Sequence, residues 1–385
     1  MSDSAEKRSR IAIVTTVHPW GDPRVFERNA CAAVEWGLEV HAFVPANGEL
    51  ELPEWARSER FHFHALPLPR NRFSRFLLSF VALTAVLRSG RFGLVHFHDP
   101  ELIPAMILLR MLRPRVKVLY DVHEELPLEV YCKPYIPRPF KPLASWFASG
   151  LWWLAAHSFH SFAPATEPIA GYWPPARTRV VRNYPKAVFH LPKNGVPDPD
   201  RVVFTGGLAE IRGIRELLMA TNNLRSEFGS LRLELYGRIM DAELAPLIES
   251  AVRETWCLHT PWLSQNELAQ RLCGAGVGVT PYHPVPSFLE GLPTKMFEYM
   301  ALGIPTLTSD FPLWKQIVAS SESGICVQPT VAGLQHGLRS MISDRTKLQH
   351  WSENGRRAYK KHYRWEVESS NLRWLYETNG LALSS

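Results

Sequence analysis

The 385-residue sequence has few cysteines, and it lacks the common motifs of metal sites and nucleotide-triphosphate sites. Its five cysteines are scattered, with no Cys-x-x-Cys pair and no His-Cys cluster, which argues against a disulfide framework or a zinc site and favours a reducing cytoplasm. No Asp-x-Asp follows an expected strand, and there is neither a Walker-type phosphate loop nor a Gly-x-Gly-x-x-Gly turn after the first strand. The sequence therefore predicts no metal site.

We expect no signal peptide, and the sequence has no apolar run of membrane-spanning length. The amino terminus is polar and leads straight into an expected strand. The apolar run 76–87 is too short to cross a bilayer, which needs about 20 residues. The uncharged segment 142–166 contains His157 and His160 and lies between two expected strands. We expect it to form a buried or interfacial helix.

Positive charge is concentrated in the first half of the chain. Residues 1–190 hold 23 Lys and Arg against 17 Asp and Glu, whereas residues 191–385 hold 20 of each. Such an excess favours an anionic partner, and without a nucleic-acid-binding motif we expect a membrane surface and no nucleic acid. Arg70, Arg72 and Arg75 begin a segment without acids, which favours a basic amphipathic helix on anionic lipid. The alternative is an ordinary crossover helix with a solvated basic edge.

The chain length suits two domains of roughly 150–200 residues. Short apolar runs alternate with helix-length segments, which predicts parallel sheets with crossover helices. The expected strands are residues 10–16, 39–44, 93–97, 116–120 and 158–163, then 201–205, 231–236, 276–280, 304–308 and 324–328. The segment 191–200 is dense in Pro, Gly and Asp, and it is the expected domain boundary. The fold class is therefore α/β, with two Rossmann-like, doubly wound domains.

Polar side chains follow several of the expected strands. Ligands of doubly wound sheets bind outside the carboxyl ends of the strands. The residues at these ends are Thr15, Thr16, His18, His96, His98, Asp99 and His123 in the first half, and Gly206 and Gly207 in the second. His98 and Asp99 either bind an acceptor, or Asp99 caps the helix expected to start near Pro100.

Two acids flank an expected helix start in the second half. Seven residues separate Glu290 from Glu298, and Pro293 between them suits a first helical position. The backbone amides of 292–295 would then favour an anion such as a diphosphate. Each carboxylate could accept hydrogen bonds from sugar or ribose hydroxyls, and two ordinary acids on a solvated helix are the alternative.

This stretch, which runs on into Met-Ala-x-Gly-x-Pro, resembles the signature of the family-4 retaining glycosyltransferases of GT-B fold, of the bacterial polysaccharide or glycolipid type. Residues 204–213 resemble the family's Gly-Arg-Leu-x3-Lys-Gly element, with Arg212 in the place of the lysine and Gly207 in the place of another basic residue. The tail 363–377 resembles its closing helix.

The resemblance implies a GT-B architecture whose two domains face each other across a cleft. Its acceptor domain would be residues 1–190, its nucleotide-sugar domain 191–362, and its closing helix, in 363–385, would pack back toward the first domain. The implied activity is retaining, metal-independent hexosyl transfer from a UDP- or GDP-sugar, without a cofactor. The expected acceptor is a glycan, lipid-linked in our preferred interpretation, and the expected location is cytoplasmic, peripheral at the inner face of the membrane.

The resemblance also implies roles for single residues. Glu298 would bind ribose, Glu290 the donor sugar, and His123 the sugar near its reacting carbon. The expected catalytic residues are His123, Glu290 and Arg212. The expected donor-binding residues are Gly206, Gly207, Arg212, Gly291, Leu292, Pro293, Thr294, Lys295 and Glu298.

The first strand–helix loop departs from the family pattern. Many relatives have Gly-Gly here, whereas this chain keeps only Gly21, and Arg24 can supply charge in its place. The residues expected at the acceptor or the cleft are His18, Asp22, Arg24, His98 and Asp99. Two alternatives remain open: a sugar-nucleotide epimerase of the same fold, and a non-catalytic partner protein, which the glycine at position 207 would suit.

Overall fold

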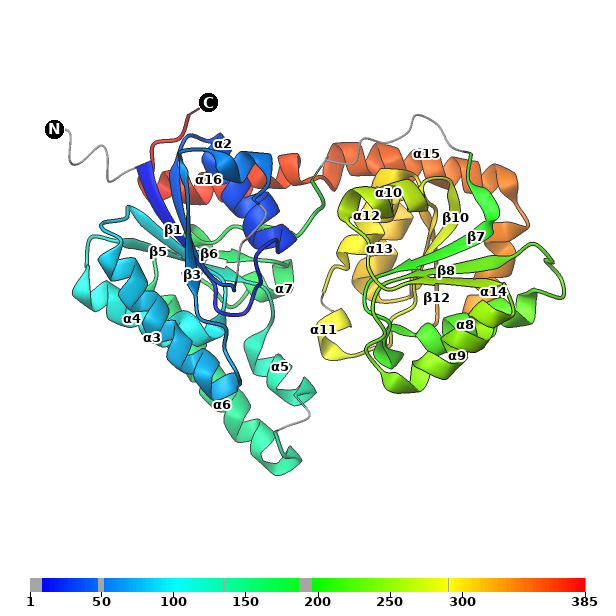
Figure 1. The fold of residues 1–385 in the computed structure, drawn as a ribbon, viewed down its shortest axis with the longest axis horizontal. Helices are drawn as coiled ribbons and strands as arrows, with labels where there is room; N and C mark the ends of the chain where they lie inside the picture. Colours follow the sequence, from blue (N-terminus) through cyan, green and yellow to red (C-terminus); the bar gives the residue numbers. More distant parts are fainter. Residues whose placement is uncertain (1–8, 48–51, 134–135, 187–195, 290, 385) are drawn as a thin grey trace. The chain divides into compact units, whose positions relative to one another are not determined.

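The computed structural model describes residues 9–47, 52–133, 136–186, 196–289 and 291–384, which form two compact units (Figure 1). Unit 1 comprises Met1–Asn183 and Glu368–Ser385, and unit 2 comprises Tyr184–Val367. Each unit contains one six-stranded parallel sheet with helices on its faces, so the expected α/β class is confirmed.

The division between the units falls at Asn183 and Tyr184, ahead of the segment 191–200 in which the boundary was expected. Residues 196–200 of that segment are described, and Asp198 already begins a strand and pairs with Ala275. Proline is tolerated in the first residues of a strand, which is why a segment rich in turn residues starts a sheet strand here.

The sheet of unit 1 has the strand order β3-β2-β1-β4-β5-β6. Its strands are β1 (Arg10–Val14), β2 (Glu39–Pro45), β3 (Phe61–Leu66), β4 (Leu94–Phe97), β5 (Lys117–Val122) and β6 (Ser161–Pro164). Strand β3 was not expected from the sequence. It is an edge strand in which His62 and His64 interrupt the apolar run, because only part of its surface is buried.

Helices cover both faces of this sheet. They are η2 (Pro23–Ala30, a π-helix), α2 (Cys31–Glu35), α3 (Arg72–Arg88), α4 (Ile103–Leu112), α5 (Leu126–Cys132), α6 (Lys141–Ser158) and α7 (Glu167–Ala170), with the 3₁₀ turns η3 (Glu54–Arg57), η4 (Pro100–Leu102), η5 (Arg138–Phe140) and η6 (Pro175–Arg177). Helix α6 ends at Ser158, so the segment 142–166 is a helix followed by β6, not one continuous helix.

The closing helix α16 (Trp365–Thr378) belongs to unit 1 from Glu368 onward. Leu372, Leu375 and Tyr376 on it are fully buried. The hydroxyl of Tyr376 lies 2.9 Å from Nδ1 of His96, and Arg182 donates a hydrogen bond to Glu368. The apolar side of this helix therefore completes the unit 1 core.

The sheet of unit 2 has the order β12-β11-β10-β7-β8-β9. Its strands are β7 (Asp198–Thr205), β8 (Arg232–Tyr236), β9 (Cys257–Thr260), β10 (Ala275–Thr280), β11 (Thr306–Ser309) and β12 (Gly324–Val327). Its helices are η7 (Glu210–Arg212), α8 (Ile214–Leu224), η8 (Ala242–Leu244), α9 (Ala245–Arg253), α10 (Gln265–Leu272), α11 (Pro286–Leu289), α12 (Thr294–Leu302), α13 (Pro312–Ser321), α14 (Val331–Ile342) and α15 (Arg345–His362). The short, largely exposed edge strand β9 was also not expected.

In both sheets the strand order reverses beside the first strand of the unit. Strands β2 and β4 flank β1, and strands β8 and β10 flank β7. Adjacent loops leave in opposite directions at such a point and open a crevice outside the carboxyl ends of the strands. The loops after β1 and β4, and those after β7 and β10, are therefore the places to look for ligand-binding side chains.

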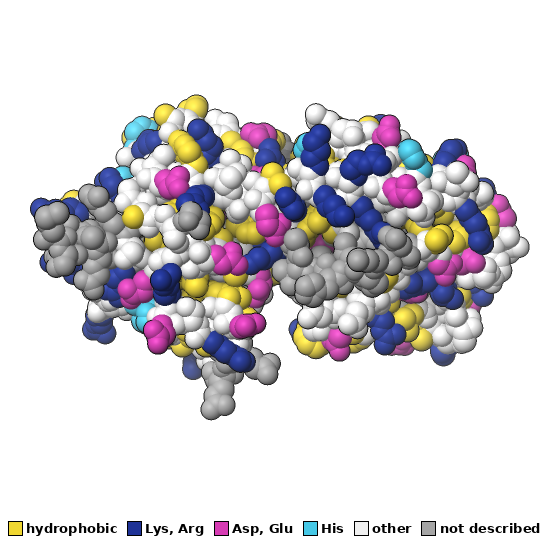
Figure 2. Space-filling view, turned by 90° about the horizontal axis from the view of Figure 1, so that it is seen from above, with side chains coloured by type: hydrophobic (Ala, Val, Ile, Leu, Met, Phe, Trp, Pro, Cys, Tyr) yellow, Lys and Arg dark blue, Asp and Glu magenta, His cyan; other side chains and the backbone are white. Residues whose placement is uncertain are grey.

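The apolar content of the helices and the charge on the surface of unit 2 bear on possible partners. Among the described residues, no helix is long and apolar enough to cross a membrane. Figure 2 shows Lys and Arg side chains on the face of unit 2 where α15 lies, and this helix holds six Lys and Arg against one Glu. The even charge balance of the second half of the chain therefore conceals a local basic surface.

Candidate functional site

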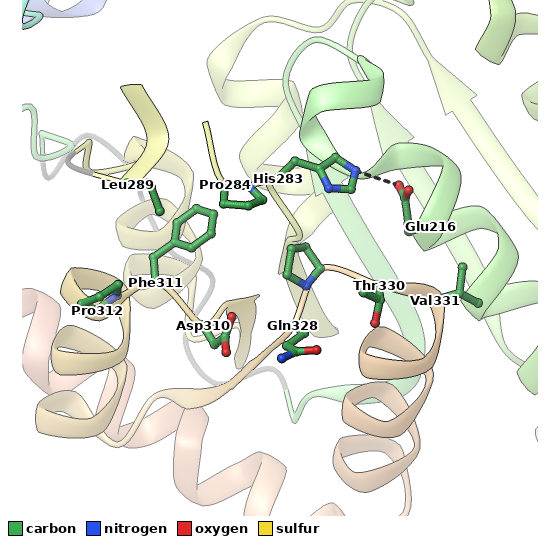
Figure 3. A pocket seen from close by; sticks show the side chains of 11 residues that line it. Glu216, His283, Pro284, Leu289, Asp310, Phe311, Pro312, Gln328, Thr330 and Val331 are labelled. Atoms are coloured by element: carbon green, nitrogen blue, oxygen red, sulfur yellow. Dashed lines mark ion pairs between the residues drawn. The ribbon is translucent and has the colours of Figure 1, made fainter. Parts of the chain in front are cut away.

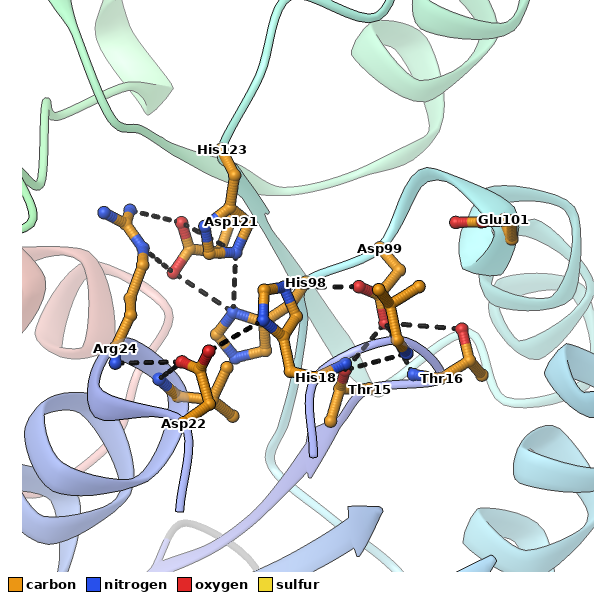
Figure 4. Close-up of polar contacts among 12 residues, drawn as sticks. Thr15, Thr16, His18, Asp22, Arg24, His98, Asp99, Glu101, Asp121 and His123 are labelled. Atoms are coloured by element: carbon orange, nitrogen blue, oxygen red, sulfur yellow. Dashed lines mark hydrogen bonds and ion pairs between the residues drawn. The ribbon is translucent and has the colours of Figure 1, made fainter. Parts of the chain in front are cut away.

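The loops after β1, β4 and β5 bring polar side chains together in unit 1 (Figure 4). Asp99, which follows β4, turns its Oδ2 toward the loop after β1. This oxygen accepts hydrogen bonds from the Thr15 hydroxyl at 2.8 Å, from the Thr16 backbone N–H and from the Val17 backbone N–H at 3.3 Å. The side chain makes no capping bond to the turn that begins at Pro100. Asp99 therefore shapes the first loop and does not act as a helix cap.

His18 lies between two carboxylates. Its Nδ1 is 3.0 Å from Oδ2 of Asp22, and its Nε2 is 3.5 Å from Oδ1 of Asp99. Burial alone would lower the pKa of His18, but the hydrogen bond to Asp22 and the charge of Asp99 outweigh it and raise the pKa. The same contact lowers the pKa of Asp22 despite its burial. The two carboxylates thus favour the protonated form of His18 at the edge of the sheet.

Asp22 also begins the helix that follows the loop. Its Oδ1 accepts hydrogen bonds from the backbone N–H groups of Arg24 and Val25, as an N-cap residue does. Gly21 precedes it with φ of 85°, a conformation that glycine adopts without strain. This local geometry explains why the loop keeps one glycine and then an aspartate.

Arg24 does not supply free charge to the loop, contrary to the expectation from the sequence. Its side chain is buried, and its Nε and Nη2 both donate hydrogen bonds to the Asp121 carboxylate. The helix η2 points the guanidinium inward, toward a carboxylate 97 positions later in the chain. Arg24 therefore neutralises Asp121, and its place among the expected acceptor residues stays a prediction.

Asp121 was not expected from the sequence to be part of the site. It lies fully buried on β5 and also accepts a hydrogen bond from Asn29 at 2.9 Å. Burial would raise the pKa of Asp121, but the charge of Arg24 holds it well below its ordinary value. Its sequence signal is an acid inside an apolar strand, in Leu-Tyr-Asp-Val-His. A buried acid needs partners, so this position was a candidate for a polar network.

His98 and His123 meet beside Asp121. Nδ1 of His98 is 3.3 Å from Asp121 Oδ2 and 3.2 Å from Nε2 of His123. The His123 side chain is 20% exposed, whereas His98 is fully buried. Burial lowers the pKa of His123 well below its ordinary value, so this imidazole is neutral at neutral pH. His123, with its ring centroid 5.0 Å from that of His18, can therefore reach a ligand as a neutral hydrogen-bonding group.

Two groups of side chains among the described residues could hold a metal ion, although the sequence predicts no metal site. They are His96, His98 and Asp121, and Glu39, His41 and His62. In each group a guanidinium already contacts the carboxylate: Arg24 contacts Asp121, and Nε of Arg10 lies 3.1 Å from Glu39. A metal ion would have to compete with these arginines for the same oxygens.

The second candidate site lies at the switch point of unit 2. A Cβ added to Gly206 would stand 2.8 Å from Nζ of Lys295 and 3.6 Å from Nη1 of Arg212, so both cations lie over this glycine. Arg212 Nη1 also donates a hydrogen bond to the Gly207 carbonyl at 2.9 Å. Gly206 and Lys295, which lie 89 positions apart in the chain, are thus parts of one positively charged site.

Tyr282 joins the two cations and was not expected from the sequence. It follows β10, and its hydroxyl accepts a hydrogen bond from Lys295 at 2.6 Å. The guanidinium of Arg212 stands 5.8 Å from the centre of the Tyr282 ring. Its only sequence signal was its place just after an expected strand. Lys295 is therefore a positioned side chain, not a freely solvated one.

The glycines of this site are required by close contacts. Gly213 has φ of 66°, and an added Cβ would lie 2.0 Å from the Pro281 carbonyl oxygen. The loop after β7 and the loop after β10 can approach each other only because this position has no side chain. The glycine at position 213 is thus a packing requirement at the switch point.

The two acids, Glu290 and Glu298, stand on either side of the start of helix α12 in the sequence. Pro293 has ψ of 116° and is the N-cap, so the helix begins at Thr294, one residue later than expected. Glu298 lies on the second turn of α12 and is partly buried. Gly291, Leu292, Thr294 and Lys295 surround this helix start. Glu290 lies outside the described residues.

A cavity of about 650 Å³ opens elsewhere in unit 2 (Figure 3). It lies beyond the carboxyl ends of β10, β11 and β12, where Asp310 and Gln328 face it and His283 pairs with Glu216 at 3.3 Å. Its lining includes none of the described donor-binding candidates. Leu289 is the part of the lining nearest to α12 in the chain. The cavity and the cationic site are therefore separate features of the same sheet edge.

The sequence matches two glycosyltransferase families. Residues 189–358 match the family described as Glycosyl transferases group 1, and residues 21–184 match the Glycosyl transferase 4-like domain. The two matches together account for most of both units. No curated protein matches the sequence.

Solved structures of similar fold cover nearly the whole chain. Sucrose-phosphate synthase from Thermosynechococcus elongatus is 18% identical with a TM-score of 0.74, covering 96% of this chain and 98% of that one. The HepE protein of Anabaena, solved with UDP and glucose, is 12% identical with a TM-score of 0.70, covering 96% and 99%. An α,α-trehalose 6-phosphate synthase from Burkholderia multivorans is 14% identical with a TM-score of 0.67, covering 96% and 97%. At these identities the likeness establishes the GT-B fold.

Proposed function

Because the chain belongs to the group 1 glycosyltransferases, with a glycosyltransferase 4-like amino-terminal domain, we propose that it transfers a hexose from a nucleoside-diphosphate sugar to a glycan acceptor with retention of configuration. The observation that carries this proposal is the pair of cations, Arg212 and Lys295, over Gly206 at the switch point of unit 2. Two positive charges beside a small residue suit a diphosphate.

The donor is bound by unit 2 in this proposal. Arg212, Lys295 and the amino-terminal end of α12 stabilise the diphosphate of a UDP- or GDP-sugar, without a metal ion or a cofactor. Glu298 accepts hydrogen bonds from the ribose hydroxyls. Glu290 binds the hydroxyls of the transferred sugar.

The proposed reaction is a front-face displacement. The acceptor hydroxyl oxygen forms a bond to the anomeric carbon while the bond from that carbon to the leaving phosphate oxygen breaks. The electron pair of the broken bond stays on the diphosphate, and the acceptor proton passes to a leaving phosphate oxygen. Stabilising the negative charge on the departing diphosphate lowers the barrier, and Arg212 and Lys295 perform this task.

Unit 1 supplies hydrogen-bonding groups for the sugar and the acceptor. His123 orients the transferred sugar as a neutral imidazole, which its lowered pKa supports. The Asp22 and Asp99 carboxylates both contact His18, so acidic groups line this edge of the sheet. A neutral, hydroxyl-rich acceptor suits such an edge better than an anionic one.

We place the protein on the cytoplasmic face of a membrane, in the biosynthesis of a bacterial polysaccharide or glycolipid with a lipid-linked acceptor. Arg70 and Arg72 are exposed at the start of α3, where they can contact anionic lipid. Nε of Arg75 lies 3.4 Å from Glu101, so its charge is partly satisfied within the protein. Replacing Arg70 should therefore weaken binding to acidic liposomes more than replacing Arg75.

Titration calorimetry without added metal tests the donor site. The full chain is titrated with UDP, GDP, ADP, CMP and NAD, and one nucleoside diphosphate should bind in the micromolar range. Glu298→Gln should weaken this binding about tenfold, because the hydrogen bond from ribose loses its charge assistance, a difference of about 1.4 kcal/mol. The matched control is Glu227→Gln, which changes an exposed acid paired with Arg339 in the same unit.

Turnover separates the two acids. Glu290→Ala should depress sugar transfer while nucleotide binding is retained. A folded protein that binds none of the five nucleotides would refute the transferase and favour a non-catalytic protein. Release of free nucleotide and altered sugar in the absence of any acceptor would favour an epimerase.

A further inference from the structure

Helix α6 carries large apolar side chains on the face that it turns away from unit 1. Phe140, just before the helix, and Leu143, Trp146, Phe147 and Trp153 on it are 60%, 62%, 71%, 71% and 61% exposed. Their spacing of three and four residues places them on one side of the helix. A contiguous exposed apolar stripe of this kind marks an interaction surface, whereas single exposed apolar residues need no explanation.

The opposite side of α6 already has its partner. Ala148, Trp152 and Ala155 are buried against the unit 1 core, and the Ser145 hydroxyl donates a hydrogen bond to the Pro127 carbonyl at the start of α5. The exposed stripe is therefore not a core face that another part of unit 1 covers. Its side chains stand on a helix whose orientation is set by packing.

Neighbouring helices on the same side of the sheet also expose apolar side chains. Helix α4 packs between α3 and α6, as the ribbon in Figure 1 shows. Helix α3 exposes Phe73 near its start, and α4 exposes Met111 near its end. The α6 stripe therefore lies on a side of unit 1 where other helices expose apolar side chains too.

The charges around the stripe indicate the kind of partner. Arg138 and Lys141 stand at the start of α6, and Arg70 and Arg72 stand at the start of α3. The sequence has no Asp or Glu from Val130 through Thr166. Cations beside exposed Trp and Phe match the two layers of a bilayer surface, anionic headgroups and the acyl boundary beneath them. A second copy of the chain would instead bring like charges together.

We propose that the outer face of α6 inserts into the interfacial layer of an anionic phospholipid bilayer, with Trp146 and Phe147 as its principal apolar anchors. The inference rests on the proposed membrane partner. It makes α6, and not the arginines of α3, the main membrane attachment. Helix α6, the helical part of the segment 142–166, is buried on one side and exposed on the other.

This attachment also places the acceptor side of unit 1 beside the lipid. Helix α5 begins three residues after His123, contacts α6, and exposes Leu128 and Tyr131. The Glu125 carboxylate that precedes it accepts a hydrogen bond from Tyr172, which holds the connection in place. A glycan whose lipid anchor remains in the bilayer would thus approach the His123 edge from α5 and α6.

Vesicle co-sedimentation tests the proposal with the full chain. Wild-type protein should bind vesicles of phosphatidylcholine with phosphatidylglycerol, and it should bind pure phosphatidylcholine more weakly. Trp146→Gln with Phe147→Gln should lower the partition coefficient about 30-fold or more, because two large rings no longer leave water. The loss should persist in high salt, whereas the loss caused by Arg70→Gln with Arg72→Gln should disappear there.

Trp262→Gln is the matched control, because it removes an equally exposed tryptophan, 67% exposed, from unit 2. It should sediment with vesicles like the wild type. Unchanged sedimentation of the α6 double variant, or loss of binding in the control, would overturn the proposal. Light scattering that shows a dimer broken by the α6 variant would assign the face to a second copy instead. Nucleotide calorimetry on the same variants checks that they are folded. It also measures nucleotide binding independently of vesicle binding.

Discussion

Replacing Asp121 with Asn should destabilise unit 1 strongly. The carboxylate is fully buried and holds the buried guanidinium of Arg24 through two hydrogen bonds. The asparagine keeps the shape of the side chain but removes its charge, so Arg24 remains buried without a counter-ion. Breaking one partner of a buried ion pair costs about 3–5 kcal/mol, and we expect a loss in this range for the free energy of unfolding of unit 1.

The matched control is an ion pair on the surface. Glu227 and Arg339 in unit 2 are 44% and 43% exposed, and their side chains lie 2.8 Å apart. Glu227→Gln should cost about 0–1 kcal/mol, because water and salt screen an exposed pair. The contrast between the two variants isolates burial, since both replace a carboxylate by its amide.

Hydrogen exchange followed by mass spectrometry is the appropriate assay, because two units do not guarantee a single unfolding transition. Exchange in β1 and β5 reports on unit 1, and exchange in β7 reports on unit 2. Adding Arg24→Met to Asp121→Asn should recover about 2 kcal/mol or more, since the uncompensated charge is then gone. If Asp121→Asn cost less than about 1 kcal/mol in β1 and β5, the account of Asp121 as a buried counter-ion would be wrong.

Three further predictions concern pH and the donor site. His96 is fully buried, and burial lowers its pKa to about 4, so between pH 6.5 and pH 4 only the unfolded chain gains this proton. The contribution of neutral His96 to the free energy of unfolding is therefore complete above pH 6.5 and declines by about 1.4 kcal/mol per pH unit toward pH 4. A free energy of unfolding that does not change between pH 7 and pH 5 would contradict this prediction. Gly213→Ala should abolish nucleotide binding or unfold unit 2, because its Cβ would meet the Pro281 carbonyl oxygen at 2.0 Å; wild-type calorimetry and melting would exclude this. Tyr282→Phe removes the hydroxyl that holds Lys295 and should weaken diphosphate binding about threefold to tenfold, with unchanged binding as the contrary result.

Much of the cationic site over Gly206 could be predicted because its signals are local. Glycine spacing, a cation after the turn and a proline before α12 are each readable within a short window. The sequence did not reveal Tyr282, whose partner Lys295 comes from a different loop. The helix start expected at Pro293 was wrong by one residue, because the ψ of Pro293 is set by how the preceding loop enters the helix.

The polar cluster of unit 1 was harder to predict because its charges are satisfied over long sequence separations. Arg24 reads as a free cation in the chain, but the fold pairs it with Asp121. His18 reads as one of many histidines, but two carboxylates from different loops contact it. A titratable group's charge depends on its neighbours in space, which a single sequence does not specify.

The sequence by itself determined two parallel α/β sheets, the buried strands and the positions where polar residues end them. These follow from apolar periodicity and turn residues, which act within a few positions. Only the tertiary structure decided the edge strands β3 and β9, the partner of Arg24, and which face of α6 meets solvent. The reason is physical: β3 and β9 are only partly buried, unlike the edge strand β6, and a charge or an apolar face acquires its role from the groups that packing places against it.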